Sequence, residues 1–294
     1  MLDIDTCRER IAISGTEFPH RPLQEVLDVA TTLGVRQLEL WIPHNFVFED
    51  LGRVQSILAD QGLHAAIIST WTQLNLPGDV KPRQLLIRQS IEAAKVLHAR
   101  SVNTYFGAHP TRTPEDSIRT YRENIMPLVE LAEKQGVYIT LENEFEPTGQ
   151  DLTRRAVGVR RIIEAVNSPF FRVNYDPCNF YFAGEEPYPY AYELLKDHIG
   201  YIHLKDGLKY NPLIHPDPGE GFLWKDLSGD YVCCPMGRGA INFEPLIGII
   251  NSSGYNGILT LEPHVHPAIL METFRQSLEF VRQRLQSKDQ GGRQ

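Results

Sequence analysis

The chain has 294 residues, with 29 Lys and Arg against 37 Asp and Glu, and a formal net charge of -8 at pH 7. Hydrophobic residues make up 42% and charged residues 22%, which excludes a disordered or fibrous protein. A chain of this size buries about 75% of the surface that its unfolded form exposes, so it can fold without disulfides or a structural metal. The negative charge counts against a nucleic-acid partner.

The sequence shows no sign of export or of membrane insertion. No apolar run approaches the ~20 residues of a membrane-spanning helix, so no membrane partner is expected. The opening MLDIDTCRERIAIS carries acids and arginines where a secretory signal has an apolar segment. No C-x-x-C pair or secreted-type framework is formed by the four cysteines, Cys7, Cys178, Cys233 and Cys234. We therefore expect a cytoplasmic protein.

Short runs typical of strands recur along the chain and alternate with amphipathic stretches typical of helices. The predicted strands are Ile11–Ser14, Gln37–Trp41, His64–Thr70, Ser101–Gly107, Tyr138–Asn143, Phe171–Pro177, Gly200–Asp206 and Gly257–Pro263. The clearest predicted helices are Pro22–Leu33, Arg83–Leu97, Asp116–Gln135 and Thr153–Val166. Several helices end at a glycine that leads directly into the next strand, as in LGVRQLEL and QGVYITLE.

Eight strands that alternate with helices predict a (β/α)8 TIM barrel. An open doubly wound sheet is the alternative, but no G-x-G-x-x-G turn follows the first strand. We predict one barrel domain over residues 1–285 and a polar tail over 286–294. The last two strands start 57 residues apart, against 26 to 37 elsewhere, which predicts a long loop insertion after strand 7, at 207–239. Its aromatic residues could cover a substrate or contact a second copy of the chain.

Four consecutive late strands carry a polar residue at or near their carboxyl ends. These are Glu142 in YITLEN, Asp176 in FRVNYDPCN, His203 in GYIHLKD and Glu262 in GILTLEPH. Each alone could be a salt-bridge partner or a satisfied core residue. Together, three carboxylates in one low-dielectric barrel mouth would repel unless a cation lies among them. We therefore predict one divalent metal ion, with Mn²⁺ or Mg²⁺ favoured by the oxygen-rich set and Co²⁺ or Zn²⁺ as alternatives.

Several segments resemble the xylose isomerase-like TIM-barrel superfamily, which includes sugar phosphate isomerases and epimerases. They are LEN at 141–143, YDPCN at 175–179, HLKDG at 203–207, GRGAINFEPL at 237–246 and LTLEPH at 259–264. The resemblance implies that Glu142, Asp176, His203 and Glu262 are metal ligands. It also implies that Glu142 and Glu262 are the catalytic carboxylates that move protons.

Two departures from the family pattern bear on the reaction. Asn179 stands where endonuclease IV-like members and ketose epimerases carry histidine, and Lys205-Asp206 replaces an arginine of the epimerases. The Asp-x-His of the endonuclease metal sites is also absent after His203. These differences count against a nuclease and against simple ketose epimerisation.

Four further residues are expected to bind substrate: Lys205, Asn179, Arg238 and Trp71. Lys205 shares a strand face with His203 because it lies two residues on. A solvated lysine and a surface ion pair are the alternatives for Lys205 and Arg238. Other residues could line the pocket or support it from the core, namely Glu39, Trp41, His64 and Tyr105.

The sequence favours a metal-dependent isomerase or epimerase that acts on a sugar, cyclitol or related polyol through a metal-stabilised enediolate. A dehydratase or lyase acting on a keto-sugar, inosose or keto-acid would use the same site and the same first step. An endonuclease IV-like enzyme and a non-catalytic sugar-binding barrel are the remaining hypotheses. The partner is expected to be a small molecule, and homo-oligomerisation is left open.

Overall fold

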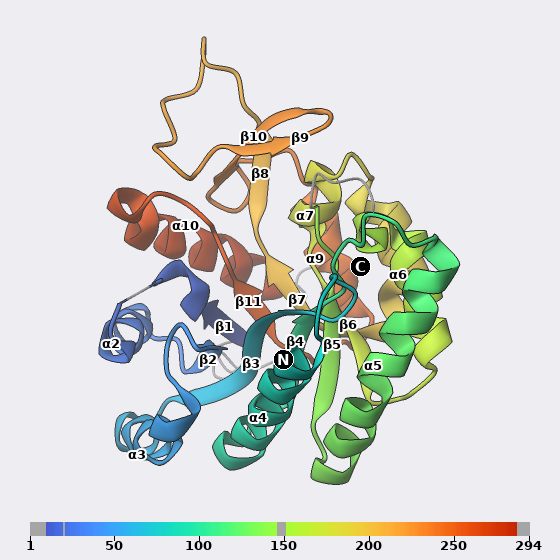
Figure 1. The fold of residues 1–294 in the computed structure, drawn as a ribbon. Helices are drawn as coiled ribbons and strands as arrows, with labels where there is room; N and C mark the ends of the chain where they lie inside the picture. Colours follow the sequence, from blue (N-terminus) through green and yellow to red (C-terminus); the bar gives the residue numbers. More distant parts are fainter. Residues whose placement is uncertain (1–9, 20, 146–150, 287–294) are drawn as a thin grey trace, which may run out of the picture.

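The computed structural model describes residues 10–19, 21–145 and 151–286. In this part of the chain eight parallel strands close into a barrel in the order β1, β11, β7, β6, β5, β4, β3 and β2. The predicted (β/α)8 barrel is confirmed (Figure 1). The strands are β1 (Ile11–Ser14), β2 (Gln37–Ile42), β3 (His64–Gln73), β4 (Ser101–Tyr105), β5 (Tyr138–Glu142), β6 (Phe171–Tyr175), β7 (Ile199–Leu204) and β11 (Leu259–Leu261).

Helices connect the strands and surround the barrel (Figure 1). They are α2 (Leu23–Leu33), α3 (Leu51–Gln61), α4 (Lys81–Leu97), α5 (Pro114–Gln135), α6 (Ala156–Val166), α7 (Pro177–Phe182), α8 (Tyr192–Leu195), α9 (Phe243–Ser252) and α10 (Pro267–Gln286). Short turns of 3-10 or π type occur at Gly15–Glu17, Phe48–Asp50, Leu152–Arg154, Pro187–Ala191 and Lys196–His198. No described helix combines the length and the apolar character needed to cross a membrane.

Local signals explain where the long helix α5 begins and ends. Thr113 precedes it and its side-chain oxygen accepts the N–H of Asp116, while Pro114 occupies the first turn, where no intrahelical N–H is needed. The helix stops at Gly136, whose φ of 70° is in the left-handed region that glycine adopts without strain. The chain then enters β5, which carries Glu142.

Side-chain alternation along each strand separates the apolar layer from the barrel interior. On β2, Leu38 and Leu40 belong to the large apolar cluster that packs against the helices. Glu39 and Trp41 alternate with them and take part in the polar contacts of the interior. The charged residues inside the barrel are therefore buried, and each needs a partner.

The structure shifts several predicted strand ends. The strand predicted at 171–177 ends at Tyr175, because Asp176 caps α7 and Pro177 begins that helix. The strand predicted at 257–263 is only Leu259–Leu261. Asp176 and Glu262 are thus the first residues after their strands, while Glu142 is the last residue of β5.

The segment 207–239, predicted as a loop insertion, contains a small antiparallel sheet. Its strands are β8 (Asp206–Lys209), β9 (Trp224–Asp226) and β10 (Gly229–Cys234), and β10 lies between the other two. Figure 1 shows this sheet projecting from the barrel beyond the end of β7. Cys7 lies outside the described residues, and so does the predicted polar tail 286–294 beyond Gln286.

Asp206 ties together the two ends of this segment. Its Oδ2 accepts the N–H groups of Gly237 at 2.8 Å and Gly239 at 3.0 Å, and its Oδ1 accepts the N–H of Gly207 at 2.9 Å. A Cβ atom at Gly239 would lie 2.0 Å from Oδ1, so only glycine allows this approach. Burial raises the pKa of Asp206 to about 6, although hydrogen bonds from backbone N–H groups, that of Gly239 foremost, oppose the shift.

Replacing Asp206 by alanine is expected to loosen the inserted sheet. The variant leaves three N–H groups without their acceptor, at a cost of about 1–3 kcal/mol. Limited proteolysis should then cut within 207–239 faster than in the wild type. The exposed Asp217, which bonds only the nearby Gly219 N–H, supplies the control Asp217→Ala. Equal cleavage rates in the two variants would contradict this role for Asp206.

Candidate metal centre

Four side chains from successive barrel strands meet at the mouth of the barrel. Glu142 ends β5, Asp176 follows β6, His203 lies on β7 and Glu262 follows β11. One potential ligand atom from each lies within 4.8 Å of the others, and all four residues are buried. The described residues contain no other such group of His, Cys, Asp and Glu.

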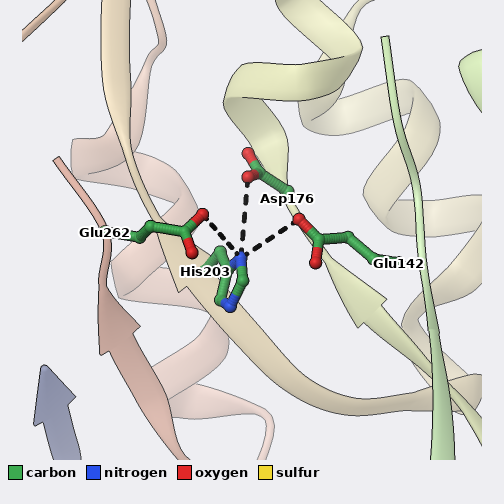
Figure 2. Close-up of side chains that lie close together, drawn as sticks. All are labelled: Glu142, Asp176, His203 and Glu262. Atoms are coloured by element: carbon green, nitrogen blue, oxygen red, sulfur yellow. Dashed lines mark hydrogen bonds and ion pairs between the residues drawn. The ribbon is translucent and has the colours of Figure 1, made fainter. Parts of the chain in front are cut away.

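The three carboxylates surround one nitrogen of His203 (Figure 2). Nδ1 lies 3.1 Å from Glu262 Oε2, 3.2 Å from Glu142 Oε1 and 3.8 Å from Asp176 Oδ2. Burial alone would lower the pKa of His203, but the carboxylates of Glu262, Glu39 and Glu142 raise it well above its usual value. Without a metal ion, protons on His203 and on a neighbouring amine balance the clustered negative charge.

That amine belongs to Lys205, which the sequence analysis placed on the same strand face as His203. Its Nζ lies 2.8 Å from Asp176 Oδ2 and 3.2 Å from Glu262 Oε2. Burial by itself would raise the pKa values of Asp176 and Glu262. Lys205 nevertheless helps to hold the pKa of Asp176 below its usual value. The pKa of Glu262 is held well below its usual value by His203, His264 and Lys205 together.

Glu142 is held by side-chain amides in addition to its contact with His203. Oε2 accepts hydrogen bonds from Asn103 Nδ2 at 2.8 Å and Asn174 Nδ2 at 2.9 Å. Oε1 accepts one from Asn179 Nδ2 at 3.3 Å. Asn179, which is predicted to bind substrate, is buried and also bonds the carbonyl oxygen of Asn143. It does not line the cavity at the mouth of the barrel.

The donor set fits a divalent cation. Three carboxylates and one imidazole nitrogen converge from fixed strand ends, and hydrogen bonds orient Glu142 and Glu262 without saturating them. An oxygen-rich set with one nitrogen suits Mn²⁺ and Mg²⁺, and it also accepts Zn²⁺ or Co²⁺. Glu142, Asp176, His203 and Glu262 could hold such an ion, which would compete with the Nδ1 proton of His203.

A cavity of about 360 Å³ opens above these residues. One wall is aromatic: Trp41, Trp71 and Tyr105 come from β2, β3 and β4, and the rings of Trp71 and Tyr105 are 4.5 Å apart. Trp224 of the inserted sheet and Phe145 form another wall, with ring centroids 5.8 Å apart. The remaining lining residues are Thr16, Glu142, Glu144, Lys205, Leu223, Lys225, Glu262 and His264.

Not every residue singled out in the sequence reaches this cavity. Trp71 and Lys205 line it, whereas Arg238 is exposed and lies between the two glycines that bond Asp206. His64 is exposed at the first residue of β3, the opposite end of that strand from Trp71. Cys178 is fully buried and lines no part of the cavity.

His264 and Glu17 form a pair that the sequence analysis did not identify. The backbone N–H and Nδ1 of His264 lie 3.0 Å and 2.7 Å from Glu17 Oε1. Nε2 lies 3.4 Å from Glu262 Oε2, and the ring centroid is 5.6 Å from that of Trp224. The φ of His264 is 46°, an uncommon value for a residue other than glycine, and the bonds to Glu17 maintain it. In the sequence, His264 is marked only as the last residue of the LEPH motif.

This pair predicts a pH dependence of stability. Burial would lower the pKa of His264, but Glu17 and Glu262 raise it to about 9. Because an unfolded histidine titrates near 6.5, the stabilisation is complete below about pH 6.5 and is lost as the pH rises through about 9. In the metal-free protein we expect the free energy of unfolding to fall by about 1–3 kcal/mol over this range.

Chemical denaturation of the metal-free protein at a series of pH values measures this effect. Glu17→Gln removes the main partner of His264, so its stability should change less between pH 6.5 and 9.5. Glu25→Gln serves as the control, because Glu25 is a half-buried carboxylate that pairs with Arg21 and not with a histidine, and it should leave the slope as in the wild type. Identical slopes in all three proteins would show that the pair does not titrate in this window.

A family model described as a xylose isomerase-like TIM barrel matches residues 27–284. The chain belongs to this family. The resemblance seen in the LEN, YDPCN, HLKDG and LTLEPH segments is therefore confirmed. A comparison with curated protein sequences finds no match.

Solved structures share the fold of this xylose isomerase-like protein. A Mycobacterium smegmatis xylose isomerase-like TIM-barrel protein in complex with magnesium matches with a TM-score of 0.73 and 17% identity, over 95% of this chain and 97% of the other. The probable 3-DHS dehydratase AsbF of Bacillus anthracis matches with a TM-score of 0.72 and 17% identity, over 92% of this chain and 98% of the other. The 3-keto-D-glucoside 4-epimerase YcjR of E. coli matches with a TM-score of 0.68 and 14% identity, over 93% of this chain and 99% of the other. At these identities the likeness establishes the fold.

Proposed function

We propose that this xylose isomerase-like protein is a divalent-metal-dependent isomerase or epimerase of a sugar, cyclitol or related polyol. The observation that carries the proposal is the buried cluster of three carboxylates and one imidazole beneath a cavity with aromatic walls. We propose Mn²⁺ as the ion, because carboxylate oxygens dominate the set and one nitrogen is present. When bound, the ion would supply the positive charge that stabilises an enediolate.

Glu142 and Glu262 are the proposed catalytic carboxylates. Both line the cavity, and β7 and β6 separate their strands on one side of the barrel, so they approach the substrate from different directions. The low pKa of Glu262 keeps its carboxylate ionised. The amide bonds to Glu142 fix the orientation of its carboxylate. One glutamate would remove a proton beside the carbonyl, and the other would return it.

Lys205 and Trp71 are the proposed substrate-binding residues of the cavity. The Lys205 ammonium lies beside both Asp176 and Glu262, where it could donate a hydrogen bond to a substrate oxygen. Trp71 is half exposed on the aromatic wall, and its ring offers an apolar face to the C–H groups of a polyol. Trp224 faces the cavity from the inserted sheet and would help to exclude water from the enediolate.

The position of Lys205 also favours a second candidate, a dehydratase or lyase acting on a keto-sugar, inosose or keto-acid. An ammonium beside the proposed base Glu262 could donate a proton to a departing hydroxyl group after the same first step. The fold likeness to a probable 3-DHS dehydratase supports keeping this reaction in the test.

Product analysis distinguishes the two reactions. The purified protein is first analysed for bound metal, then loaded with Mn²⁺ and incubated in D₂O with a panel of ketoses, inososes and keto-acids, with NMR detection. Solvent deuterium in a product of unchanged formula identifies an isomerase or epimerase, whereas loss of water or C–C cleavage identifies a dehydratase or lyase. Failure of the purified protein to bind divalent metal would contradict the proposal and favour a non-catalytic barrel.

A further inference from the structure

Glu39 is a buried carboxylate that belongs neither to the four proposed ligands nor to the cavity lining. It lies in the middle of β2 and is 0% exposed. Its Oε2 lies 2.9 Å from Nε2 of His203, although the two residues are 164 positions apart in the sequence. An ionised carboxylate buried this completely is costly unless a specific partner compensates it. His203 is that partner.

This contact determines which nitrogen of His203 faces the ligand cluster. A carboxylate accepts hydrogen bonds and cannot donate them, so the bond to Glu39 requires a proton on Nε2. Nδ1 is the other nitrogen, and it points at the carboxylates of Glu142, Asp176 and Glu262 (Figure 2). With Nε2 bonded to Glu39, the lone pair available to a cation is on Nδ1.

Glu39 is itself held by side chains from two other strands of the barrel, the adjacent β3 and the more distant β7. Its Oε1 accepts the hydroxyl hydrogen of Ser69 on β3 at 2.6 Å and that of Tyr201 on β7 at 3.3 Å. The Tyr201 ring also meets the His203 ring edge to face, with centroids 5.2 Å apart. The carboxylate is therefore fixed relative to His203 before any ligand arrives, which is what an orienting group requires.

We propose that Glu39 is a positioning residue that fixes the tautomer and ring orientation of His203 for metal binding at Nδ1. This inference rests on the proposed metal-dependent function and assigns a role to a residue outside the ligand set. Outer carboxylates of this kind typically change metal affinity by about 10- to 100-fold when they are removed. Glu39 would act without touching substrate or metal.

A simpler explanation is that any change to a buried carboxyl group at the mouth of the barrel weakens cation binding. Glu144 provides the control, because it is a buried carboxylate that lies beside the cluster, lines the cavity and contacts Asn179. Burial and the nearby Glu142 raise the pKa of Glu144 well above its usual value. Glu144→Gln changes a carboxyl group near the same ion but leaves His203 and its bond to Glu39 intact.

Calorimetric titration of Mn²⁺ into chelator-treated protein tests the proposal. Glu39→Gln presents both a donor and an acceptor to the imidazole and should weaken Mn²⁺ binding about 10-fold, while Glu39→Ala should approach a 100-fold loss. Glu144→Gln should weaken binding by less than Glu39→Gln does. Equal losses in the two Gln variants would overturn the positioning role and favour a general effect of the buried carboxyl groups.

A double-mutant cycle and a spectroscopic measurement separate positioning from a merely structural role. In a His203→Ala background, adding Glu39→Gln should cause no further loss of Mn²⁺ affinity, because the side chain it orients is gone. Long-range ¹H–¹⁵N spectra of the Zn²⁺-loaded wild type should show His203 protonated at Nε2. A full further loss in the double variant, or a proton on Nδ1 of the Zn²⁺-loaded protein, would refute the proposal.

The Mn²⁺ affinities of Ser69→Ala and of the wild type are compared with those of the Glu39 variants. Ser69→Ala leaves Glu39 and His203 in place but removes the 2.6 Å bond that holds the carboxylate, so it should lower Mn²⁺ affinity by less than Glu39→Ala. It replaces the Glu39 variants if they fail to fold, and unchanged affinity would then count against the proposal. If the wild type itself binds no Mn²⁺, the proposed function fails. If the wild type binds and Glu39→Gln binds equally well, only the positioning role fails.

Discussion

Glu142→Gln and Glu262→Gln should each lower turnover by about 10²-fold or more, which is the usual contribution of a general base. Glutamine keeps the shape of the side chain and one oxygen that can ligate a metal ion, but it cannot accept the substrate proton. Metal content should therefore remain largely as in the wild type while kcat falls. The measurement is kcat on the substrate identified in D₂O, together with metal analysis of the same preparations.

Glu244, exposed in the first turn of α9, provides a matched control for this experiment. Glu244→Gln makes the same chemical change far from the cavity and should leave kcat unchanged. If both Glu142→Gln and Glu262→Gln retain near-wild-type rates, the two-glutamate mechanism is wrong. Lys205 would then be the first alternative base, since it also lines the cavity beside Glu262, but it would first have to lose the proton that Asp176 and Glu262 stabilise.

His203→Ala should produce the second large effect, a loss of divalent metal affinity of about 100-fold or more, since removing outer partners alone costs 10- to 100-fold. The imidazole supplies the single nitrogen of the set, and no other described histidine belongs to the cluster. The variant also leaves the buried Glu39 with the hydroxyl groups of Ser69 and Tyr201 but without the imidazole, so some loss of stability is expected. Metal analysis after dialysis and titration calorimetry measure the effect.

His109, which lies in the loop after β4 and outside the cluster, supplies the control variant His109→Ala. It should bind metal as the wild type does. A His203→Ala protein that is folded and keeps a full equivalent of tightly bound metal would remove His203 from the ligand set. The remaining carboxylates would then have to hold the ion by themselves.

Much of the fold could be predicted because it depends on local patterns. Apolar runs bounded by glycine, helix-capping residues such as Thr113 and stop glycines such as Gly136 are encoded within a few residues. The regular spacing of such units favours a closed parallel barrel. Predicted ends shifted where local capping competes with strand pairing, as at Asp176, whose carboxylate accepts the N–H groups of Cys178 and Asn179 at the start of α7.

The candidate ligands could also be predicted together, for a geometric reason. In a parallel barrel all strands end at the same rim, so polar residues at the ends of successive strands must converge. Glu142, Asp176, His203 and Glu262 satisfy this condition, and the structure places them within a few ångströms of one another. Their position after β5, β6, β7 and β11 needs only the order of the elements.

The sequence by itself thus determined the barrel, its family and the residues that meet at its mouth. Only the tertiary structure decided the contacts between residues far apart in the sequence: Glu39 with His203, Glu17 with His264, and Trp224 at the cavity that the aromatic wall also lines. It also placed Lys205 inside the cavity and Arg238 outside it. Local propensity carries no information about such contacts, because they join strands or loops as many as 247 residues apart and depend on how the closed barrel brings its interior side chains together.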